Sequence, residues 1–402
     1  MLPLEGITVV ALEQAVAVPF ATRQLADLGA RVIKIERIGV GDFARQYESA
    51  VRGMSAHFVW LNRSKESLAL DMKQPEAQRI VHQLLATADV FIQNLAPGAA
   101  ERLSFGAASL HEQYPRLIIC DLSGYGSSGP YRDKKAYDLL VQCETGVVSV
   151  TGTPESPAKA GVAVADLAGG MYAYSGILTA LIQRGRTGEG TTLEVSLFDG
   201  LAEWMGYPAY FTKYGGTPPA RTGASHATIA PYGPFATGDG GTVFLGVQNE
   251  REWTKFCVAV LEQPDITTDS RFATGPARVA HREELHREIN AVFGTLTAAQ
   301  VVARLEAAGI ANARLNSVQE FLNHPQLATR DRWQDVASPA GVLSMLKPPV
   351  IIGGIEPRMD PIPAVGAHTE AILRSLGYDD TEIERLRAEN VIEATKPEGE
   401  TR

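Results

Sequence analysis

Residues 7–36 read ITVVALEQAVAVPFATRQLADLGARVIKIE and contain the pattern that decides the fold. The β-branched run at 7–12 predicts a strand, residues 19–30 are compatible with a helix, and residues 31–36 predict a second strand. A strand, a helix and another strand in this order form the crossover unit of a parallel sheet. The sequence therefore predicts an α/β fold built on a parallel sheet.

Similar units follow downstream, with helical stretches at 75–88 and 111–116, each ahead of an apolar run, at 88–94 and 117–126. Ligands of parallel sheets gather at the carboxyl ends of the strands. One shared rim is therefore predicted for four segments: Gln14–Val18, Glu36–Arg45, Asn94–Gly98 and Leu122–Gly129. The turn after the first strand lacks the glycine fingerprint of a dinucleotide site, and no phosphate-loop pattern is present.

The length of 402 residues is large for a single core and favours two domains. Glycine and proline interrupt the α/β pattern in KYGGTPPARTG, at residues 213–223, and a hairpin with a glycine-rich turn follows. The sequence predicts a large Rossmann-like parallel-sheet domain over residues 1–215, a smaller α+β domain over 216–325, and a return to the large domain over 326–402.

Composition excludes several classes of partner. The apolar fraction of 45% is that of a globular protein, and 37 basic against 46 acidic residues give a net charge of −9. This balance argues against a general nucleic-acid or anionic-membrane surface, and no apolar run approaches the ~20 residues that span a bilayer. Three widely spaced cysteines suit a reducing compartment, and no metal-ligand spacing is present. We expect a soluble, cytoplasmic protein without a metal.

The stretch GVAVADLAGGMYAYSGILTALIQRG, residues 161–185, places one acid, Asp166, at the start of an apolar helix. Backbone N–H groups and the helix dipole there favour an ionised carboxylate. The local sequence leaves two interpretations open, a helix N-cap and a carboxylate nucleophile. Gly169 and Gly170 beside it would let another backbone or a ligand come close.

Basic residues are concentrated beside the predicted rim: Lys34, Arg37, Arg45, Arg63, Lys65, Arg102, Lys134 and Lys135. They fit a polyanionic ligand such as a phosphate, and they equally fit scattered surface charges. Tyr137 and Asp138 come just before a helix-like apolar pattern. Asp138 is either a helix cap or a second acid that positions Asp166 or relays a proton.

Many ordered blocks resemble the class III CoA-transferase family, which includes formyl-CoA transferase and carnitine CoA-transferase. They are LEGITVVALEQAVAVPFATRQLADLGARVIKIER, GDFAR, NRSKESLALDMK, QNLAPGAAERL, SGYGSSGPY, YDLLVQ, ADLAGGMYAYSGILTALIQR, GTTLEVSLFD, TIAPYGPF and VGAHTEAIL. The resemblance covers nearly the whole chain. It implies a two-domain subunit in an interlocked homodimer, with CoA thioesters as substrates and no tightly bound cofactor.

The resemblance also implies roles for individual residues. The acid of the ADLAGG block is the family's nucleophile, which is Asp166 here, and Tyr137 and Asp138 match the tyrosine and acid that flank it. The CoA-binding positions fall on Gln14, Ala15, Val16, Arg37, Asn94, Arg102 and Lys135. The glycine-rich lid of formyl-CoA transferase has no evident copy, because HATIAPYGPF stands at 226–235.

The most similar members act on small dicarboxylates, which implies transfer of CoA from succinyl-CoA to itaconate, mesaconate or citramalate. Candidate substrate residues are Arg52, His57, Arg63 and Tyr232, with Arg63 alternatively a surface charge. An intramolecular mesaconyl-CoA transferase would use the same residues, and carnitine-type or aromatic acids are further options. The similar α-methylacyl-CoA racemases carry a histidine where Tyr137 stands. A phenol, with a pKa of about 10, is a poor proton shuttle, so racemisation is disfavoured.

Overall fold

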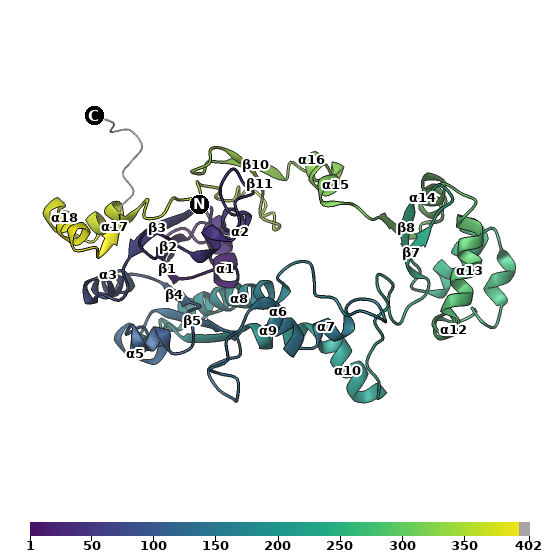
Figure 1. The fold of residues 1–402 in the computed structure, drawn as a ribbon, viewed down its shortest axis with the longest axis horizontal. Coiled ribbons are helices and arrows are strands. Elements are labelled where there is room, and N and C mark those ends of the chain that lie inside the picture. The colour runs from purple at the N-terminus through teal and green to yellow at the C-terminus, as the bar shows by residue number, and fades with distance from the viewer. Residues whose placement is uncertain (394–402) are drawn as a thin grey trace. The chain divides into compact units, whose positions relative to one another are not determined.

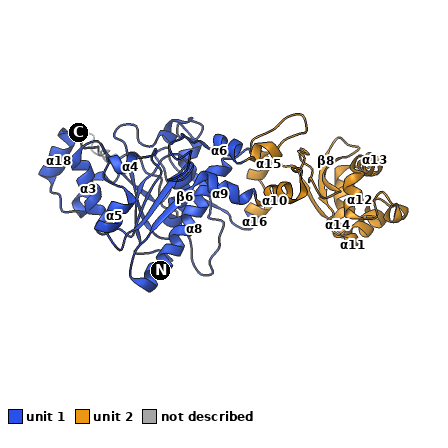
Figure 2. Ribbon diagram, turned by 90° about the horizontal axis from the view of Figure 1, so that it is seen from below, with its two compact units in different colours: residues 1–145, 161–205, 328–402 blue, residues 146–160, 206–327 orange. Residues whose placement is uncertain are grey.

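A computed structural model describes residues 1–393 of the chain (Figure 1). The chain divides into two compact units, shown in blue and orange in Figure 2. The first unit comprises residues 1–145, 161–205 and the chain from 328 onward, and the second comprises 146–160 and 206–327. The second unit thus begins ten residues before the boundary expected at 216, ends at 327 instead of 325, and includes one earlier segment.

The first unit is built on a seven-stranded sheet with the order β12-β3-β2-β1-β4-β5-β6. Six strands are mutually parallel, and β12 pairs with β3 in the antiparallel direction. The order of the six parallel strands is that of a Rossmann fold, which confirms the predicted fold class. The strands are β1 (Thr8–Leu12), β2 (Arg31–Glu36), β3 (Lys65–Leu70), β4 (Val90–Gln93), β5 (Ile118–Ser123), β6 (Thr192–Ser196) and β12 (Ile392–Glu393).

Helices and two further strands complete this unit. They are α1 (Ala17–Asp27), the 3₁₀ turn η1 (Phe43–Gln46), α2 (Ala56–Leu61), α3 (Pro75–Leu85), α4 (Ala99–Arg102), α5 (Ala107–Gln113), α6 (Asp138–Glu144), α8 (Val164–Thr187), α9 (Leu197–Trp204), the hairpin β10 (Trp333–Val336) and β11 (Leu343–Leu346), α17 (Thr369–Ser375) and α18 (Asp380–Ala388). The predicted strand–helix–strand unit is confirmed as β1, α1 and β2. No strand was predicted where β3 lies.

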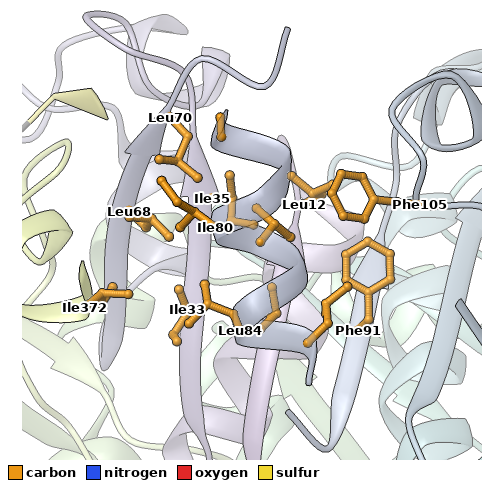
Figure 3. Close-up of a cluster of buried hydrophobic side chains, with 14 of the residues drawn as sticks. Leu12, Ile33, Ile35, Leu68, Leu70, Ile80, Leu84, Phe91, Phe105 and Ile372 are labelled. Carbon is orange, nitrogen blue, oxygen red and sulfur yellow. The ribbon is translucent and has the colours of Figure 1, made fainter. Parts of the chain in front are cut away.

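One face of the large sheet packs on α3, α5, α17 and α18 through a continuous apolar core. Figure 3 shows Ile80 and Leu84 of α3 lying over Leu12, Ile33 and other side chains of the strands. Alternate strand residues and one helix stripe supply this core because successive strand side chains point to opposite faces. β1 pairs in parallel with both β2 and β4, so the carboxyl ends of these three strands lie side by side.

The glycines of α8 allow close contact with neighbouring helices. A methyl group at Gly170 would lie 2.5 Å from the backbone oxygen of Ala17 in α1, and one at Gly169 would lie 2.7 Å from Leu197 of α9. The expectation that another backbone comes close to these glycines is therefore confirmed.

Gly170→Ala is expected to lower the free energy of unfolding by about 1–3 kcal/mol, because the methyl group overlaps the backbone of α1. Gly185→Ala, in the same helix, is the matched control. It has open space and is expected to stabilise the protein by about 0.5–1 kcal/mol. Urea unfolding of both variants measures the difference, and equal effects would contradict close packing at Gly170.

The second unit combines the antiparallel sheet β7-β8-β9 with several helices. The predicted hairpin with its glycine-rich turn is confirmed as β7 and β8. The elements are α7 (Val147–Val150), α10 (Gly206–Gly215), β7 (Tyr232–Ala236), β8 (Thr242–Gly246), α11 (Glu250–Lys255), the π turn η2 (Phe256–Val260), the 3₁₀ turn η3 (Pro264–Thr268), α12 (Gly275–Ala280), α13 (Arg282–Phe293), α14 (Ala298–Ala308), β9 (Ala311–Arg314) and α15 (Val318–Leu322), with α16 (Pro325–Thr329) at the boundary. Within residues 1–393, no helix is long and apolar enough to cross a membrane.

Candidate active site

A cleft of about 600 Å³ opens at the carboxyl ends of β1, β2 and β3. Residues from the predicted rim line it, among them Gln14, Arg37 and Leu95. The prediction of a shared rim is confirmed for these segments, whereas 122–129 contributes no lining residue. The lining residues are Leu12, Glu13, Gln14, Ile35, Glu36, Arg37, Ile38, Val40, Gly41, Asp42, Leu70, Asp71, Met72, Lys73, Leu95, Ala99, Arg102, Leu103 and Asn390.

The loop after β1 is held by side chains from two other loops. Asn94 accepts a hydrogen bond from the backbone N–H of Gln14 at 2.9 Å and donates one to its carbonyl, also at 2.9 Å. Asp42 accepts from the backbone N–H of Ala15 at 3.1 Å. Ala15 has a φ of 63°, and Val16 is the N-cap of α1. Asn94 therefore shapes the cleft wall through the backbone of Gln14.

Two lysines of the expected basic rim are buried beneath the cleft. Lys34 bonds Glu13 at 3.1 Å and Asp42 at 2.8 Å, and Lys65 bonds Glu13 at 2.6 Å. All four side chains are inaccessible to solvent. Burial lowers the pKa of Lys65 to about 8 despite the charge of Glu13. The sequence left two interpretations open for these lysines, binding of a phosphate and an exposed surface charge. Both are wrong, because Lys34 and Lys65 are buried and paired with carboxylates.

Two arginines of the rim are also engaged inside the protein. Arg45 pairs with Glu36 at 2.8 Å, and the guanidinium of Arg63 bonds both carboxylate oxygens of Asp27, at 2.8 and 2.7 Å. Arg63 is 1% exposed, so its interpretation as a surface charge is wrong. Because the guanidinium of Arg63 is buried and already bonded to Asp27, it is not available to bind a second carboxylate.

The exposed cations that line the cleft are Arg37, Arg102 and Lys73. Arg102 extends over the turn at Gly98, where a methyl group would lie 2.9 Å from its guanidinium. Lys73 was missed in the sequence because the run 65–70 was not predicted as a strand. A basic residue just past a parallel strand is the signal that would have located it. Lys135 is exposed and lies outside the cleft lining.

Asp166 is the third residue of α8, and its interpretation as an N-cap is wrong. The N-cap is Ala163, whose side chain makes no capping hydrogen bond. Asp138 does this instead, because its Oδ1 accepts from the backbone N–H of Ala165 at 2.7 Å and of Asp166 at 3.4 Å. Asp138 therefore caps α8 and not its own helix, α6, whose N-cap is Tyr137.

The electrostatics around Asp166 differ from the sequence expectation. Burial, followed by the charge of Asp138, raises the pKa of Asp166 to about 7. These effects outweigh the helix dipole, because desolvation in a half-buried site opposes any charge. No ion-pair partner of Asp166 occurs among residues 1–393.

Tyr47 is a neighbour of Asp166 that the sequence analysis missed. Burial and the charges of Asp42 and Asp166 raise the pKa of Tyr47 to about 12. Its ring meets that of His57 edge-on, with centroids 5.4 Å apart. The segment from Asp42 to Tyr47 thus joins a residue that lines the cleft to one that interacts electrostatically with Asp166. Tyr47 lies two residues past the predicted rim segment Glu36–Arg45, and this position was the available signal.

The remaining candidate residues lie in different settings. Arg52 donates to the backbone oxygen of Val342 at 3.1 Å. Tyr137 is 69% exposed. Tyr232 belongs to the second unit, where its ring stacks on His226 with centroids 5.2 Å apart.

Comparison with known proteins identifies the family of this chain. The model of CoA-transferase family III matches residues 4–369. The chain is 34% identical over 398 residues to the succinyl-CoA:glutarate CoA-transferase of Mus musculus, covering 98% of this chain and 91% of the relative. It is 31% identical to the succinyl-CoA:D-citramalate CoA-transferase of Chloroflexus aurantiacus, covering 97% and 98%.

A solved structure shows the same fold. The crystal structure of a CaiB/BaiF family protein from Brucella suis superimposes with a TM-score of 0.81 at 32% sequence identity, covering 93% of this chain and 99% of that one. The family match spans both units, and the relatives are aligned over nearly their full length. The chain therefore belongs to CoA-transferase family III.

Proposed function

We propose that this enzyme moves CoA from succinyl-CoA to a small dicarboxylic acid, with Asp166 as the nucleophile. The observation that carries the proposal is the half-buried Asp166, held through its backbone at the head of α8 and without a counter-ion within residues 1–393. Relatives named for glutarate and D-citramalate support a dicarboxylate acceptor. Itaconate and mesaconate belong to the same class of four- to six-carbon diacids.

The mechanism consists of successive acyl transfers. Ionised Asp166 attacks the thioester carbonyl, so that a C–O bond forms, the C–S bond breaks and CoA leaves as a thiolate. The thiolate attacks the aspartyl carbonyl of the resulting anhydride and releases succinate. The acceptor carboxylate then displaces CoA from the aspartyl thioester, and the thiolate attacks the acceptor's carbonyl and frees Asp166. The thioester's free energy is conserved only where water is excluded.

The cleft supplies the binding part of this mechanism. Arg37, Arg102 and Lys73 present exposed cations to phosphate groups, and the fixed backbone of Gln14 forms the wall nearest to β1. His57, beside Tyr47, is the group we propose for the acceptor's second carboxylate, because Arg52 and Arg63 already have partners. We further propose a homodimer in which the two chains are interlocked; light scattering tests the dimer through its mass.

A screen of acyl-CoA donors against mono- and dicarboxylic acids, with mass detection of the new thioester, tests the proposal. We expect succinyl-CoA with glutarate, citramalate, itaconate or mesaconate to give products faster than any monocarboxylate. Turnover with carnitine-type or aromatic acids alone would contradict the acceptor class. Exchange of the α-hydrogen in heavy water without transfer would indicate a racemase instead.

Arg102→Ala and Arg37→Ala are expected to raise KM for the CoA ester by roughly 10- to 100-fold each, because a lost charge-assisted contact costs about 1.5–3 kcal/mol. The kcat value should change little, since these residues bind groups remote from the thioester. Arg132→Ala, which removes an exposed cation paired with Asp133, is the matched control. A loss confined to kcat would argue against binding of phosphates in the cleft.

A further inference from the structure

Helix α6 carries a buried amide one turn beyond Asp138. Gln142 is fully buried, and its Nε2 donates a hydrogen bond of 2.7 Å to Oδ2 of Asp138. Residues four apart lie on the same face of a helix, so this contact follows from the sequence spacing. One oxygen of the Asp138 carboxylate is thereby occupied by its own helix.

The other oxygen of Asp138 reaches α8. Oδ1 accepts from the N–H groups of Ala165 and Asp166, and the N-cap residue Ala163 contributes no side-chain bond. The start of α8 therefore depends on a carboxylate from a second helix. The charge of this carboxylate also adds to the effect of burial in raising the pKa of Asp166.

Gln142 determines which way that carboxylate points. Asp138 is half-buried, so its side chain can rotate toward solvent if nothing holds it. A donor fixed on Oδ2 sets the plane of the carboxylate and directs Oδ1 at the two N–H groups. The amide is neutral, so it orients Asp138 without adding a charge beside Asp166.

We infer that Gln142 is a positioning residue for CoA transfer, holding Asp166 in place and in its electrostatic setting through Asp138. The inference rests on the proposed function, in which Asp166 is the nucleophile. Gln142 itself touches neither the thioester nor the acid in this scheme.

The first test is Gln142→Met, which removes the donor and keeps the size of the side chain. We expect kcat to fall by roughly 100-fold, as for a displaced reacting group, while KM for the CoA ester changes less than about threefold.

Wild-type kcat/KM should fall as the pH decreases through about 7, because Asp166 must be ionised. The charge that acts on Asp166 is that of Asp138, and the neighbouring Tyr47, whose own pKa Asp166 helps to raise, is neutral at these pH values. In Gln142→Met, Asp138 can turn away and its charge then raises the pKa of Asp166 less. The acid limb of the pH profile should therefore move to lower pH.

Gln142→Glu separates positioning from general loss of structure. The added carboxylate repels Asp138 when ionised and donates to it when protonated, so Asp138 should be held at low pH and released at high pH, and the acid limb should again move to lower pH. Its activity relative to wild type should therefore be higher at pH 5.5 than at pH 8. A structural defect alone would lower activity equally at both pH values.

Thr145→Val, at the end of α6, is the matched control, because Thr145 bonds the backbone oxygen of Val141 at 2.8 Å and not Asp138. Its kcat and pH profile should equal those of wild type. If the acid limb of the pH profile stays at its wild-type position in both Gln142 variants while the wild type transfers CoA, the positioning role is overturned and the proposed function stands. Failure of wild type to form an acyl adduct on Asp166 would refute both. If the Met variant fails to fold, the shift in Gln142→Glu decides.

Discussion

Asp166→Ala is expected to lower kcat for CoA transfer by about 10³-fold or more, because removal of a nucleophile abolishes the covalent route. The variant should remain folded. Burial and the charge of Asp138 raise the pKa of the Asp166 carboxyl to about 7, so its ionised form destabilises the folded protein. The variant lacks this carboxyl and should therefore be more stable than wild type above pH 7. The raised pKa disfavours the ionised form in the folded state, and this cost accumulates as the pH rises from about 4 to 7.

The adduct on Asp166 gives an independent measurement. Trypsin releases residues 160–184 as one peptide, and Asp166 is its only acidic residue. Incubation with succinyl-CoA followed by hydroxylamine or borohydride should modify that peptide in wild type and not in Asp166→Ala. Asp133→Ala, an exposed acid paired with Arg132, should retain both transfer and labelling. A label on Asp138 would keep the transferase proposal and move the nucleophile, and near-normal turnover of Asp166→Ala would refute the mechanism.

Glu13→Gln is expected to lower the free energy of unfolding by about 3–5 kcal/mol, because it removes the shared counter-charge of two buried lysines. A fall in Tm on the order of 10 °C should follow. The loss should be larger at pH 6 than at pH 9. Burial already holds the pKa of Lys65 near 8, and without Glu13 the lysine can release its proton at higher pH.

Glu66→Gln is the matched control for this prediction. Glu66 lies on β3 and binds Arg31 of β2 through two hydrogen bonds of 2.8 and 2.9 Å, but both side chains are partly exposed. Solvent screening limits such a pair to less than about 1 kcal/mol. Urea unfolding at both pH values compares the two variants. Equal losses would show that burial does not distinguish the two ion pairs.

The local sequence was sufficient for the elements that depend on neighbouring residues. β-branched runs separated by helix-compatible stretches predicted β1, α1 and β2, and the carboxyl-end rule located Gln14 and Arg37 at one rim. Asp166 was singled out by its position at the start of a long apolar helix and by family resemblance. Such elements can be predicted locally because the periodicity of side chains in strands and helices follows from backbone geometry. It does not depend on which element packs against each face.

Tertiary structure alone decided how charges and polar groups are paired. Lys65 meets Glu13 across 52 positions of the chain, and Arg63 meets Asp27 across 36, so a basic run that looks exposed is buried. Asp138 caps a helix that begins 26 residues after it, and together with burial it sets the pKa of Asp166. Charge depends on what surrounds a group in three dimensions, and local sequence carries no record of partners so distant.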